Sequence, residues 1–233
     1  FAEENNCEEK KILYSICEWG QNQPWKWGGK AGNIWRTTPD IQPNWLSVVG
    51  IYEVNVRLEK YAQPGGWNDP DMLEVGNGKL TVEENKSHFT LWAMMAAPLI
   101  LGNDIRDFIK ADGTVDADNK ILEILTNKDV IAIDQDKLGI QCSRVKSNGI
   151  TDVLVKPLEN NEAAICLFNK RLFKTKMSYS VADLHNIVNV TLPKAEKYVC
   201  KDLWDKIETV VTDSISAEVP SHGVKVYRIS ALQ

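Results

Sequence analysis

A chain of 233 residues with 43% hydrophobic and 25% charged residues has enough apolar side chains for one large domain or two smaller ones. Its net charge of −5, without a basic run carrying interleaved aromatics, argues against a nucleic acid partner. No apolar run reaches membrane-spanning length and no targeting segment follows Phe1, so we expect no membrane partner, and the compartment, cytoplasmic or secreted, stays undetermined.

The first part of the chain, residues 1–138, alternates short apolar runs with amphipathic stretches. Its predicted elements are a buried strand at 11–19 (KILYSICEW), a helix at 45–62, a glycine-rich turn at 65–73 (GGWNDPDML), a helix at 81–97, and the stretch 119–127 leading into 128–134. Such alternation is typical of βα units around a parallel sheet.

The pattern changes at Leu138 and Gly139 to short runs of alternating apolar and polar residues. The predicted strands of this second part, residues 139–233, are 151–158, 162–170, 186–192, 197–204 and 224–232. The turn clusters NNE, DKIE and PSHG separate them. The pattern predicts an antiparallel β-sandwich, so we place the domain boundary between residues 138 and 139.

The spacing of the cysteines and histidines argues against a metal centre. Five cysteines lie between Cys7 and Cys200 without a CxxC pair, which is not the pattern of a disulfide scaffold or a zinc site. The three histidines, His88, His185 and His222, lie far apart and are interpreted as structural or surface residues. The sequence therefore predicts no metal and no cofactor.

Seven of the eight tryptophans lie in the first part, several of them just after predicted strands. Ligands of parallel α/β folds bind where strands end, and a flat indole ring suits the C–H face of a sugar. Trp45 and Trp92 are exceptions, since both lie on predicted helical faces and are expected to fill core.

Charged residues lie where we expect three strands to end, in the segments 17–19 (CEW), 33–41 (NIWRTTPDI) and 65–73 (GGWNDPDML). Glu18 closes the first strand, Arg36 and Asp40 follow the second, and Asp69 and Asp71 follow the third within the glycine-rich turn. Asx residues in a tight turn often only satisfy their own backbone. The recurrence of acids and a base at equivalent positions instead favours a binding or catalytic site.

These residues also carry a resemblance to a known family. The series CEW, NIWRTTPDI, PGGWNDPDMLEVGNG, WAMMAAPL and DVIAIDQDKLG resembles the retaining α-galactosidases of glycoside hydrolase family twenty-seven, in order and at compatible spacing. The resemblance is strong from about residue 11 to residue 139. It implies the C-terminal part of a (β/α)8 TIM barrel, strands six to eight, followed by an antiparallel β-sandwich domain.

The resemblance also implies roles for individual residues. Asp40 takes the position of the general acid/base, and Arg36 contacts the sugar and the acid/base. Asp71 and Met72 line the same pocket. Glu18 takes the position that separates galactose-acting members from those accepting N-acetylgalactosamine, and it argues for galactose. Because a close ion pair would oppose protonation of Asp40, we expect Arg36 to bind hydroxyls near Asp40 rather than pair with it tightly.

The alternating direction of side chains along an extended strand, called parity here, refines these assignments. Along an extended segment Asp71 can face the sugar, while Asp69 and Asn68 satisfy backbone groups at the rim. Cys17, Glu18 and Trp19 are all assigned to substrate binding, but a regular strand cannot direct all three to one side. We therefore expect the strand to end irregularly there, or one of the three to be a supporting residue.

The nucleophile of the family is absent from these residues. It belongs to a K(Y/F)D motif on strand five, and no such motif occurs here. A complete barrel alone takes about 250 residues, so the N-terminal half of the barrel is expected to be missing. Alone, the chain should expose a parallel edge at KILYSICEW and hydrolyse nothing.

Several interpretations remain open. The protein is interpreted as an α-galactosidase acting on galactosides, with α-N-acetylgalactosaminidase and β-L-arabinopyranosidase as alternatives within the family. A sugar-binding module without catalysis and a subunit that completes a barrel with a separate chain are alternatives from other classes. An oligomer is compatible with the sequence.

Overall fold

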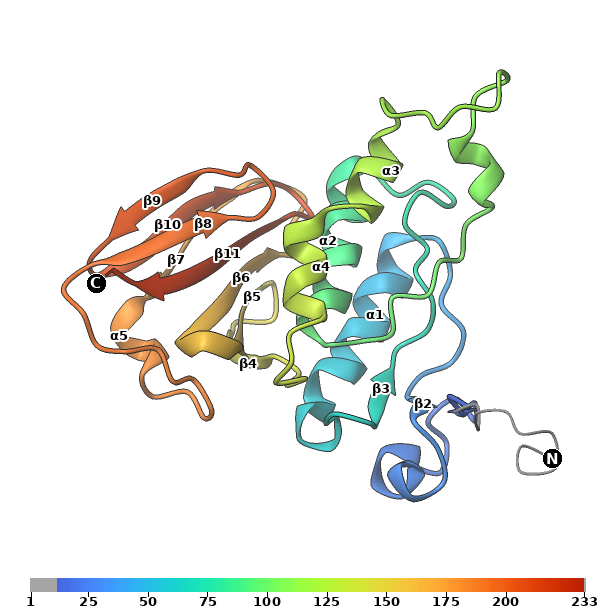
Figure 1. The fold of residues 1–233 in the computed structure, drawn as a ribbon, viewed down its shortest axis with the longest axis horizontal. Coiled ribbons are helices and arrows are strands. Elements are labelled where there is room, and N and C mark those ends of the chain that lie inside the picture. Colours follow the sequence, from blue (N-terminus) through green and yellow to red (C-terminus); the bar gives the residue numbers. More distant parts are fainter. Residues whose placement is uncertain (1–11, 233) are drawn as a thin grey trace, which may run out of the picture.

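The computed structural model describes residues 12–232, which form a helical N-terminal part and a β-rich C-terminal part (Figure 1). Three short strands, β1 (Ser15–Ile16), β2 (Ile34–Arg36) and β3 (Trp67–Asp69), make a parallel sheet in this order. Because parallel strands end at the same edge, the polar segments that follow them are brought together.

The first strand is shorter and less buried than the sequence predicts. Of the run 11–19, Lys11 lies outside the described residues and only Ser15–Ile16 forms a strand. Ile12 is 83% exposed and Leu13 66% exposed, so the prediction of a buried strand is wrong for this chain. Among residues 12–232, β1 is an edge strand that pairs with β2 alone, in agreement with the parallel edge expected at KILYSICEW.

Four α-helices cover the N-terminal part. They are α1 (Trp45–Asn55), which continues as the 3-10 helix η3 (Val56–Tyr61), α2 (Val82–Met94), α3 (Lys120–Leu125) and α4 (Lys128–Asp134). Shorter 3-10 helices are η1 (Pro24–Lys26), η2 (Gly28–Lys30) and η4 (Ile105–Phe108). The helices predicted at 45–62 and 81–97 are confirmed with shorter bounds.

Polar caps fix where these helices begin. The hydroxyl of Thr81 accepts a hydrogen bond from the Glu84 amide at 3.2 Å, and the Glu84 carboxylate accepts one from the Thr81 amide at 2.8 Å. This reciprocal capping box satisfies two backbone donors at the start of α2. At α1, α3 and α4 an asparagine side chain accepts from backbone amides of the first turn, without the reciprocal bond.

The C-terminal part is a β-sandwich. Its strands are β4 (Ser143–Ser147), β5 (Thr151–Leu158), β6 (Glu162–Asn169), β7 (Thr175–Ser180), β8 (Tyr198–Asp202), β9 (Glu208–Val211), β10 (Ser214–Val219) and β11 (Val224–Ala231). Six form an antiparallel sheet in the order β4-β5-β6-β11-β8-β9, and β10 and β7 form the second. A 3-10 turn, η5 (Glu159–Asn161), joins β5 to β6.

The strand predicted at 186–192 is wrong. This segment follows a short helix, α5 (Val181–Leu184), and contains turns in place of a strand. Asn189 has a left-handed φ of 66° and Val188 is 79% exposed, so its alternating apolar residues have no sheet partner. The other four predicted strands correspond to β5, β6, β8 and β11, whereas β4, β7, β9 and β10 were not predicted.

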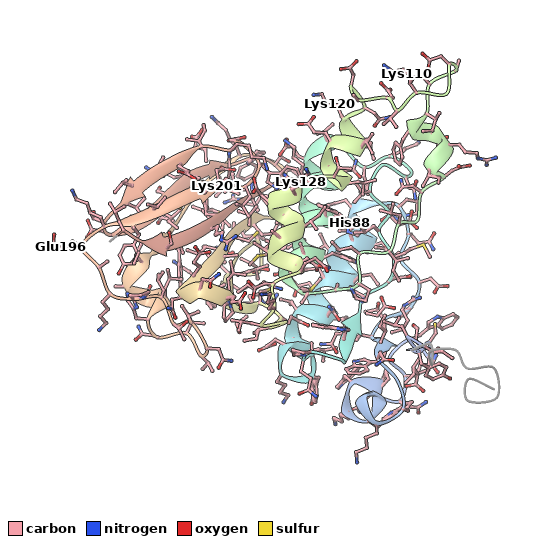
Figure 2. The ribbon with its side chains drawn as sticks, in the orientation of Figure 1. His88, Lys110, Lys120, Lys128, Glu196 and Lys201 are labelled. Atoms are coloured by element: carbon pink, nitrogen blue, oxygen red, sulfur yellow. The ribbon has the colours of Figure 1, made fainter. Side chains whose placement is uncertain are left out.

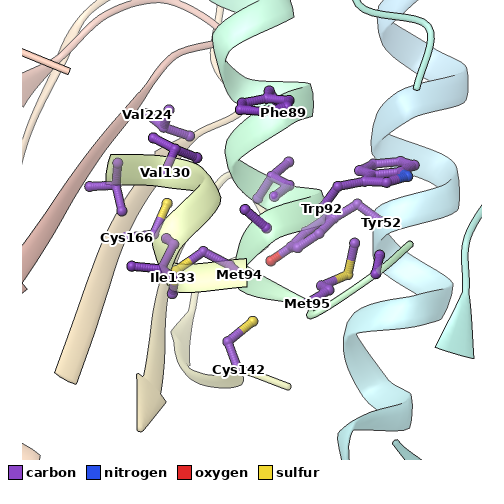
Figure 3. Packing of buried hydrophobic residues seen from close by; sticks show 14 of the residues in the cluster. Tyr52, Phe89, Trp92, Met94, Met95, Val130, Ile133, Cys142, Cys166 and Val224 are labelled. Carbon is purple, nitrogen blue, oxygen red and sulfur yellow. The ribbon is translucent and has the colours of Figure 1, made fainter. Parts of the chain in front are cut away.

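One hydrophobic core joins the two parts. Trp92 and Met94 of α2, Val130 of α4, and Cys166 and Val224 of the six-stranded sheet belong to the same buried cluster (Figure 3). A second cluster fills the space between the two sheets. Helices and sandwich therefore fold against each other, and the domain boundary between residues 138 and 139 stays a prediction.

The two helical tryptophans expected in the core behave differently. Trp92 is fully buried, whereas Trp45 is partly buried and packs edge-on against Phe168 with ring centroids 5.9 Å apart. Within residues 12–232, no helix combines the length and apolar character needed to cross a membrane.

Candidate active site

Arg36, the last residue of β2, is the centre of the polar cluster at the carboxyl edge of the sheet. Its guanidinium lies 2.7 Å from Asp71 Oδ2 and 3.1 Å from Asp40 Oδ1. It also donates to the Thr38 carbonyl at 3.4 Å and lies 3.9 Å from Cys17 Sγ. The expectation that Arg36 avoids a close pair with Asp40 is therefore wrong, because one guanidinium pairs with both carboxylates.

The two paired carboxylates differ in exposure. The side chain of Asp40 is 59% exposed, while that of Asp71 is only 7% exposed. The Arg36 side chain is 11% exposed, and its Nε is buried without a partner among the described residues. The group of this pair that a ligand hydroxyl can reach is therefore the exposed carboxylate of Asp40.

Two polar residues of the glycine-rich turn, Asn68 and Asp69, form hydrogen bonds that stabilise the turn itself. The Asn68 side chain accepts from Trp35 Nε1 at 2.8 Å and donates to Gln141 Oε1 at 3.0 Å. Asp69 Oδ1 accepts from the Asp71 amide at 2.8 Å, and burial raises the pKa of Asp69. Asn68 and Asp69 therefore stabilise the turn, as expected, and the left-handed φ of Asp71, not parity, directs Asp69 and Asp71 differently.

Asp71 is held in one orientation by several bonds. Its Oδ2 accepts from the Ile41 amide at 2.8 Å and its Oδ1 from the Met72 amide at 2.8 Å. The buried Trp92 donates to the Asp71 carbonyl at 2.8 Å. The residue has a left-handed φ of 93°, a conformation that costs about 1–3 kcal/mol and persists only where surrounding contacts impose it. Met72 follows it and is 42% exposed.

The segment after β1 leaves the strand in an irregular turn. Trp19 has a left-handed φ of 57° and is 46% exposed, which confirms that a regular strand does not continue through this segment. Cys17 is an exposed free thiol facing Arg36. Both carboxylate oxygens of Glu18 accept from Asn22, at 3.1 Å from its amide and 2.8 Å from its side chain.

The structure thus brings Cys17, Arg36, Asp40 and Asp71 into one cluster. Glu18 and Trp19 share the turn of Cys17, and Met72 shares the turn of Asp71. The sequence interpretation missed Asn22, whose contact with Glu18 depends on how the loop folds. The signal that could have found it is the polar run GQNQP directly after CEW.

No metal centre emerges from the described residues. The chain between 12 and 232 contains no group of three or more His, Cys, Asp or Glu side chains that could hold an ion. His88 lies on α2 (Figure 2), accepts from the Glu74 amide at 2.9 Å, and has its pKa lowered to about 3 by burial. His222 contacts Glu84 at 2.7 Å, where the sandwich meets α2. Cys7 lies outside the described residues.

Comparison with known proteins decides the family. Residues 2–136 match the family model described as alpha galactosidase A, and residues 148–229 match that of the alpha galactosidase C-terminal beta sandwich domain. The chain belongs to the α-galactosidase family. The three parallel strands are therefore part of the TIM barrel of glycoside hydrolase family twenty-seven, followed by its C-terminal sandwich.

Individual α-galactosidases are similar over almost the whole chain. An α-galactosidase of Cyamopsis tetragonoloba is 41% identical over 94% of this chain and 50% of its own length. Alpha-galactosidase 2 of Arabidopsis thaliana is 41% identical over 95% of this chain and 52% of its own length. The crystal structure of α-galactosidase I from Mortierella vinacea has a TM-score of 0.85 at 31% identity, covering 95% of this chain and 59% of that protein. The chain spans about half the length of the curated relatives it matches.

Proposed function

We propose that the complete protein is a retaining α-galactosidase that releases terminal α-linked galactose from oligosaccharides or glycoconjugates. In this proposal, residues 1–233 supply the acid/base Asp40 and one wall of the sugar site. The observation that carries it is the cluster in which Arg36 joins Asp40 and Asp71 across neighbouring parallel strands. The curated relatives, which are α-galactosidases, support the same substrate class.

The proposed chemistry assigns one proton to Asp40. Retaining glycosidases hold two carboxyl groups roughly 5–5.5 Å apart, one as nucleophile and one as acid. Asp40 gives its proton to the departing glycosidic oxygen while the nucleophile bonds to the anomeric carbon. It then takes a proton from the water that displaces the nucleophile. The exposure of Asp40 suits both exchanges, because a leaving group and a water must each reach it.

In this scheme Asp71 orients the guanidinium of Arg36, which in turn holds Asp40. The charge of Arg36 is shared with the buried Asp71, which is fixed by backbone donors from Ile41 and Met72. Because Asp71 already balances the guanidinium, Arg36 can hold Asp40 while Asp40 stays exposed to a ligand.

We propose that the nucleophile comes from a part of the barrel outside these residues. The edge strand β1 and the exposed Ile12 and Leu13 support a further strand beside it. A hollow of about 290 Å³ lined by Leu13, Ile34 and Trp67 lies against the same sheet, as expected for barrel residues whose apolar partners lie elsewhere.

The position of Glu18 favours galactose over N-acetylgalactosamine. A carboxylate there can accept a hydrogen bond from the hydroxyl at the second carbon of the sugar. An acetamide at that carbon would instead place its carbonyl against negative charge. The proposed substrate is therefore a galactoside with a free hydroxyl at this position.

The test uses Asp40→Asn in the complete protein. This variant should lose hydrolysis of galactosides with poor leaving groups, yet keep glycosylation by activated aryl galactosides, whose departure needs little protonation. Added azide should restore turnover with these aryl substrates and yield α-galactosyl azide, because azide displaces the nucleophile without needing a base. Asp118→Asn, which changes a carboxylate that is 96% exposed, is the matched control. Equal loss on both substrates without azide rescue would reject the acid/base role.

A further inference from the structure

A hollow of about 270 Å³ lies in the β-sandwich, between the β4–β5 hairpin of the six-stranded sheet and β7 of the second sheet. Val153 and Met177, which belong to the buried cluster between the sheets, form its apolar lining. Lys146, Arg171 and Lys176 contribute three cations, and within residues 12–232 no carboxylate lines it. The hollow therefore combines an apolar surface, which suits the C–H face of a sugar, with positive charge, which attracts an anion.

Neighbouring acids leave the positive charge of this lining unbalanced. In the described part of the chain the three cations form no ion pair, and the acids closest to them in the sheets have other partners. Glu218 lies opposite Lys176 across the β7–β10 pair but binds Lys174 at 2.8 Å. Asp152 on β5 is fully buried and binds Lys170 at 2.9 Å. In a protein with a net charge of −5, such a group of unpaired cations favours an anionic ligand.

Arg171 is held in a fixed orientation at the rim of the hollow. Its amide donates to Asn169 Oδ1 at 3.0 Å, and its carbonyl accepts from the His222 amide at 3.0 Å and the Ser221 hydroxyl at 3.1 Å. Its guanidinium lies over the ring of Phe173, 4.0 Å from the ring centroid. With one face against the ring, the guanidinium keeps N–H groups at its edge that can bind a carboxylate or phosphate through two hydrogen bonds.

The side-chain amide of Asn148, in the β4–β5 hairpin, adds a donor to the lining. Its Oδ1 accepts from the Ile150 amide at 3.1 Å, and from the Thr151 amide at 2.7 Å and hydroxyl at 3.0 Å. Because the turn engages Oδ1, the Nδ2 group is the end of the amide that remains for a ligand oxygen.

We propose that this hollow is a further ligand site, which binds a monosaccharide unit carrying a carboxylate or a phosphate group. Arg171 binds the oxyanion through two hydrogen bonds, and Lys146 and Lys176 add positive charge. Val153 and Met177 contact the C–H face of the sugar. A uronate residue of an acidic polysaccharide and a sugar phosphate offer this same chemistry, and the experiment separates the two sources. The proposed galactosidase chemistry uses none of these residues.

The test titrates the complete protein with three ligands that share one ring and differ at the sixth carbon: glucuronate, glucose 6-phosphate and glucose. NMR follows isotope-labelled methionine methyl groups. The signal of Met177, assigned through Met177→Leu, reports on the hollow, and that of Met72, next to Asp71, reports on the candidate active site. We expect at least one of the two anions to shift the Met177 signal saturably, with a Kd at least about 10-fold lower than that of glucose.

Variants of the cations test how the anion is bound. Arg171→Gln removes the charge and should raise the Kd of the anion at least about 10-fold, whereas Arg171→Lys keeps the charge without the planar fork and should raise it about 3- to 10-fold. Lys146→Gln and Lys176→Gln should each raise it about 2- to 5-fold. Lys194→Gln, which changes an exposed lysine outside the lining, is the matched control and should leave the Kd unchanged. Thermal unfolding of each variant checks that the fold is retained.

Each outcome decides for or against the site. Tighter binding of glucuronate supports it with a uronate as the ligand, and tighter binding of glucose 6-phosphate supports it with a sugar phosphate. An unshifted Met177 signal, a shift of Met72 alone, equal affinity for glucose, or an unchanged Kd in Arg171→Gln overturns it. Hydrolysis of α-galactosides is measured separately, and its absence would reject the proposed function without affecting this site.

Discussion

Arg36 lies closer to Asp71, at 2.7 Å, than to Asp40, at 3.1 Å, so the buried carboxylate is its nearer counterion. Asp71 is also 7% exposed and fixed by two backbone donors, whereas Asp40 is 59% exposed. The two carboxylates therefore differ in their relation to Arg36. Asp71 balances and orients the guanidinium, and Asp40 remains accessible to a ligand.

Removing the charge of Asp71 should therefore disturb the orientation of Arg36. In Asp71→Asn, the guanidinium loses its nearer counterion and keeps only its contact with the exposed Asp40. We expect kcat/KM on α-galactosides to fall by about 10- to 100-fold, as for a lost charged contact. Measuring kcat/KM in the complete protein checks this effect.

Asp69→Asn is the matched comparison for Asp71→Asn. An asparagine oxygen can still accept from the Asp71 amide, which is the bond that Asp69 makes in the turn. Its effect on kcat/KM should be several-fold smaller than that of Asp71→Asn. A similar loss in both variants would mean that activity depends on the negative charge of the turn and not on the pairing of Asp71 with Arg36.

A second prediction concerns Glu18 itself. Glu18→Ser removes the carboxylate and opens space beside the second carbon of the sugar. We expect kcat/KM for α-galactosides to fall by roughly one to two orders of magnitude, equivalent to one lost contact of about 1.5–3 kcal/mol to a charged group. Activity on α-N-acetylgalactosaminides should rise. Matched aryl glycosides measure both, and unchanged relative specificity would contradict the role of Glu18 in selecting the sugar.

The backbone contact at Gly20 leads to a third prediction. Gly20 has a φ of 75°, and an added Cβ would also meet the Thr37 carbonyl oxygen at 2.2 Å. Gly20→Ala should displace the Glu18 loop, reduce activity, and lower stability by about 1–3 kcal/mol. Gly65→Ala is the control, since Gly65 has a φ of 89° but open space around it. Urea unfolding should show the larger loss for Gly20→Ala; equal losses would leave only the backbone conformation as the cause.

The cluster of Cys17, Arg36, Asp40 and Asp71 could be predicted from the sequence because these residues lie at or just after the ends of neighbouring parallel strands. Parity alone does not separate Asp69 from Asp71, since residues two apart along an extended segment point to the same side. The left-handed φ of 93° at Asp71 breaks the extended geometry between them. The pairing of Arg36 was misjudged because the second carboxylate, Asp71, lies 35 residues away in the chain and enters only through the strand pairing of β2 with β3.

The errors in the fold have a similar origin. Residues 186–192 alternate like a strand, but pairing requires a neighbouring edge, and none of the described strands offers one there. The strands β7 and β10, which pair with each other, are rich in Ser and Thr, so hydrophobic periodicity alone did not reveal them. The local hydrophobic pattern thus identified the strongly apolar strands. It missed β7 and β10, whose strand conformation depends on their pairing with each other.

A fourth prediction concerns Asp134, the last residue of α4. Burial raises its pKa to about 7 from 3.8, with the nearby Lys156 opposing the shift only in part. Its Oδ1 is buried without a partner among the described residues. A raised pKa means that the protonated form favours folding, so this contribution is complete below about pH 4 and is lost as pH rises toward 7.

Asp134→Asn should remove that pH dependence by keeping the side chain neutral. At pH 8 the variant should be more stable than the unaltered protein by about 1–3 kcal/mol, because its buried side chain is a neutral amide and not a desolvated carboxylate. At pH 4 the difference should vanish. Thermal unfolding of the complete protein at both pH values measures this, and a variant that is less stable at pH 8 would instead indicate an ion pair with Lys156.

The last prediction concerns Glu53, which links the helices to the sandwich. Its carboxylate lies 2.7 Å from Arg144 and 2.7 Å from Lys170, and the buried Asp152 shares Lys170 at 2.9 Å. Partial burial opposes ionisation of Glu53, but hydrogen bonds from Lys170 and Arg144 outweigh it and lower its pKa to about 2 from 4.5. The stabilisation is therefore present above about pH 4.5 and is lost as pH falls toward 2.

Glu53→Gln should thus destabilise the protein at pH 7 by about 1–2 kcal/mol, a value reduced by the partial exposure of the pair to solvent. The cost should diminish as the pH of the unfolding measurement is lowered from 4.5 toward 2, because the unaltered carboxylate is then protonated too. Glu83→Gln, in an exposed pair 3.7 Å from Lys86, should cost less than about 0.5 kcal/mol at any pH. If both variants behave alike, the contacts of Glu53 with Arg144 and Lys170 do not stabilise the junction between the helices and the sandwich.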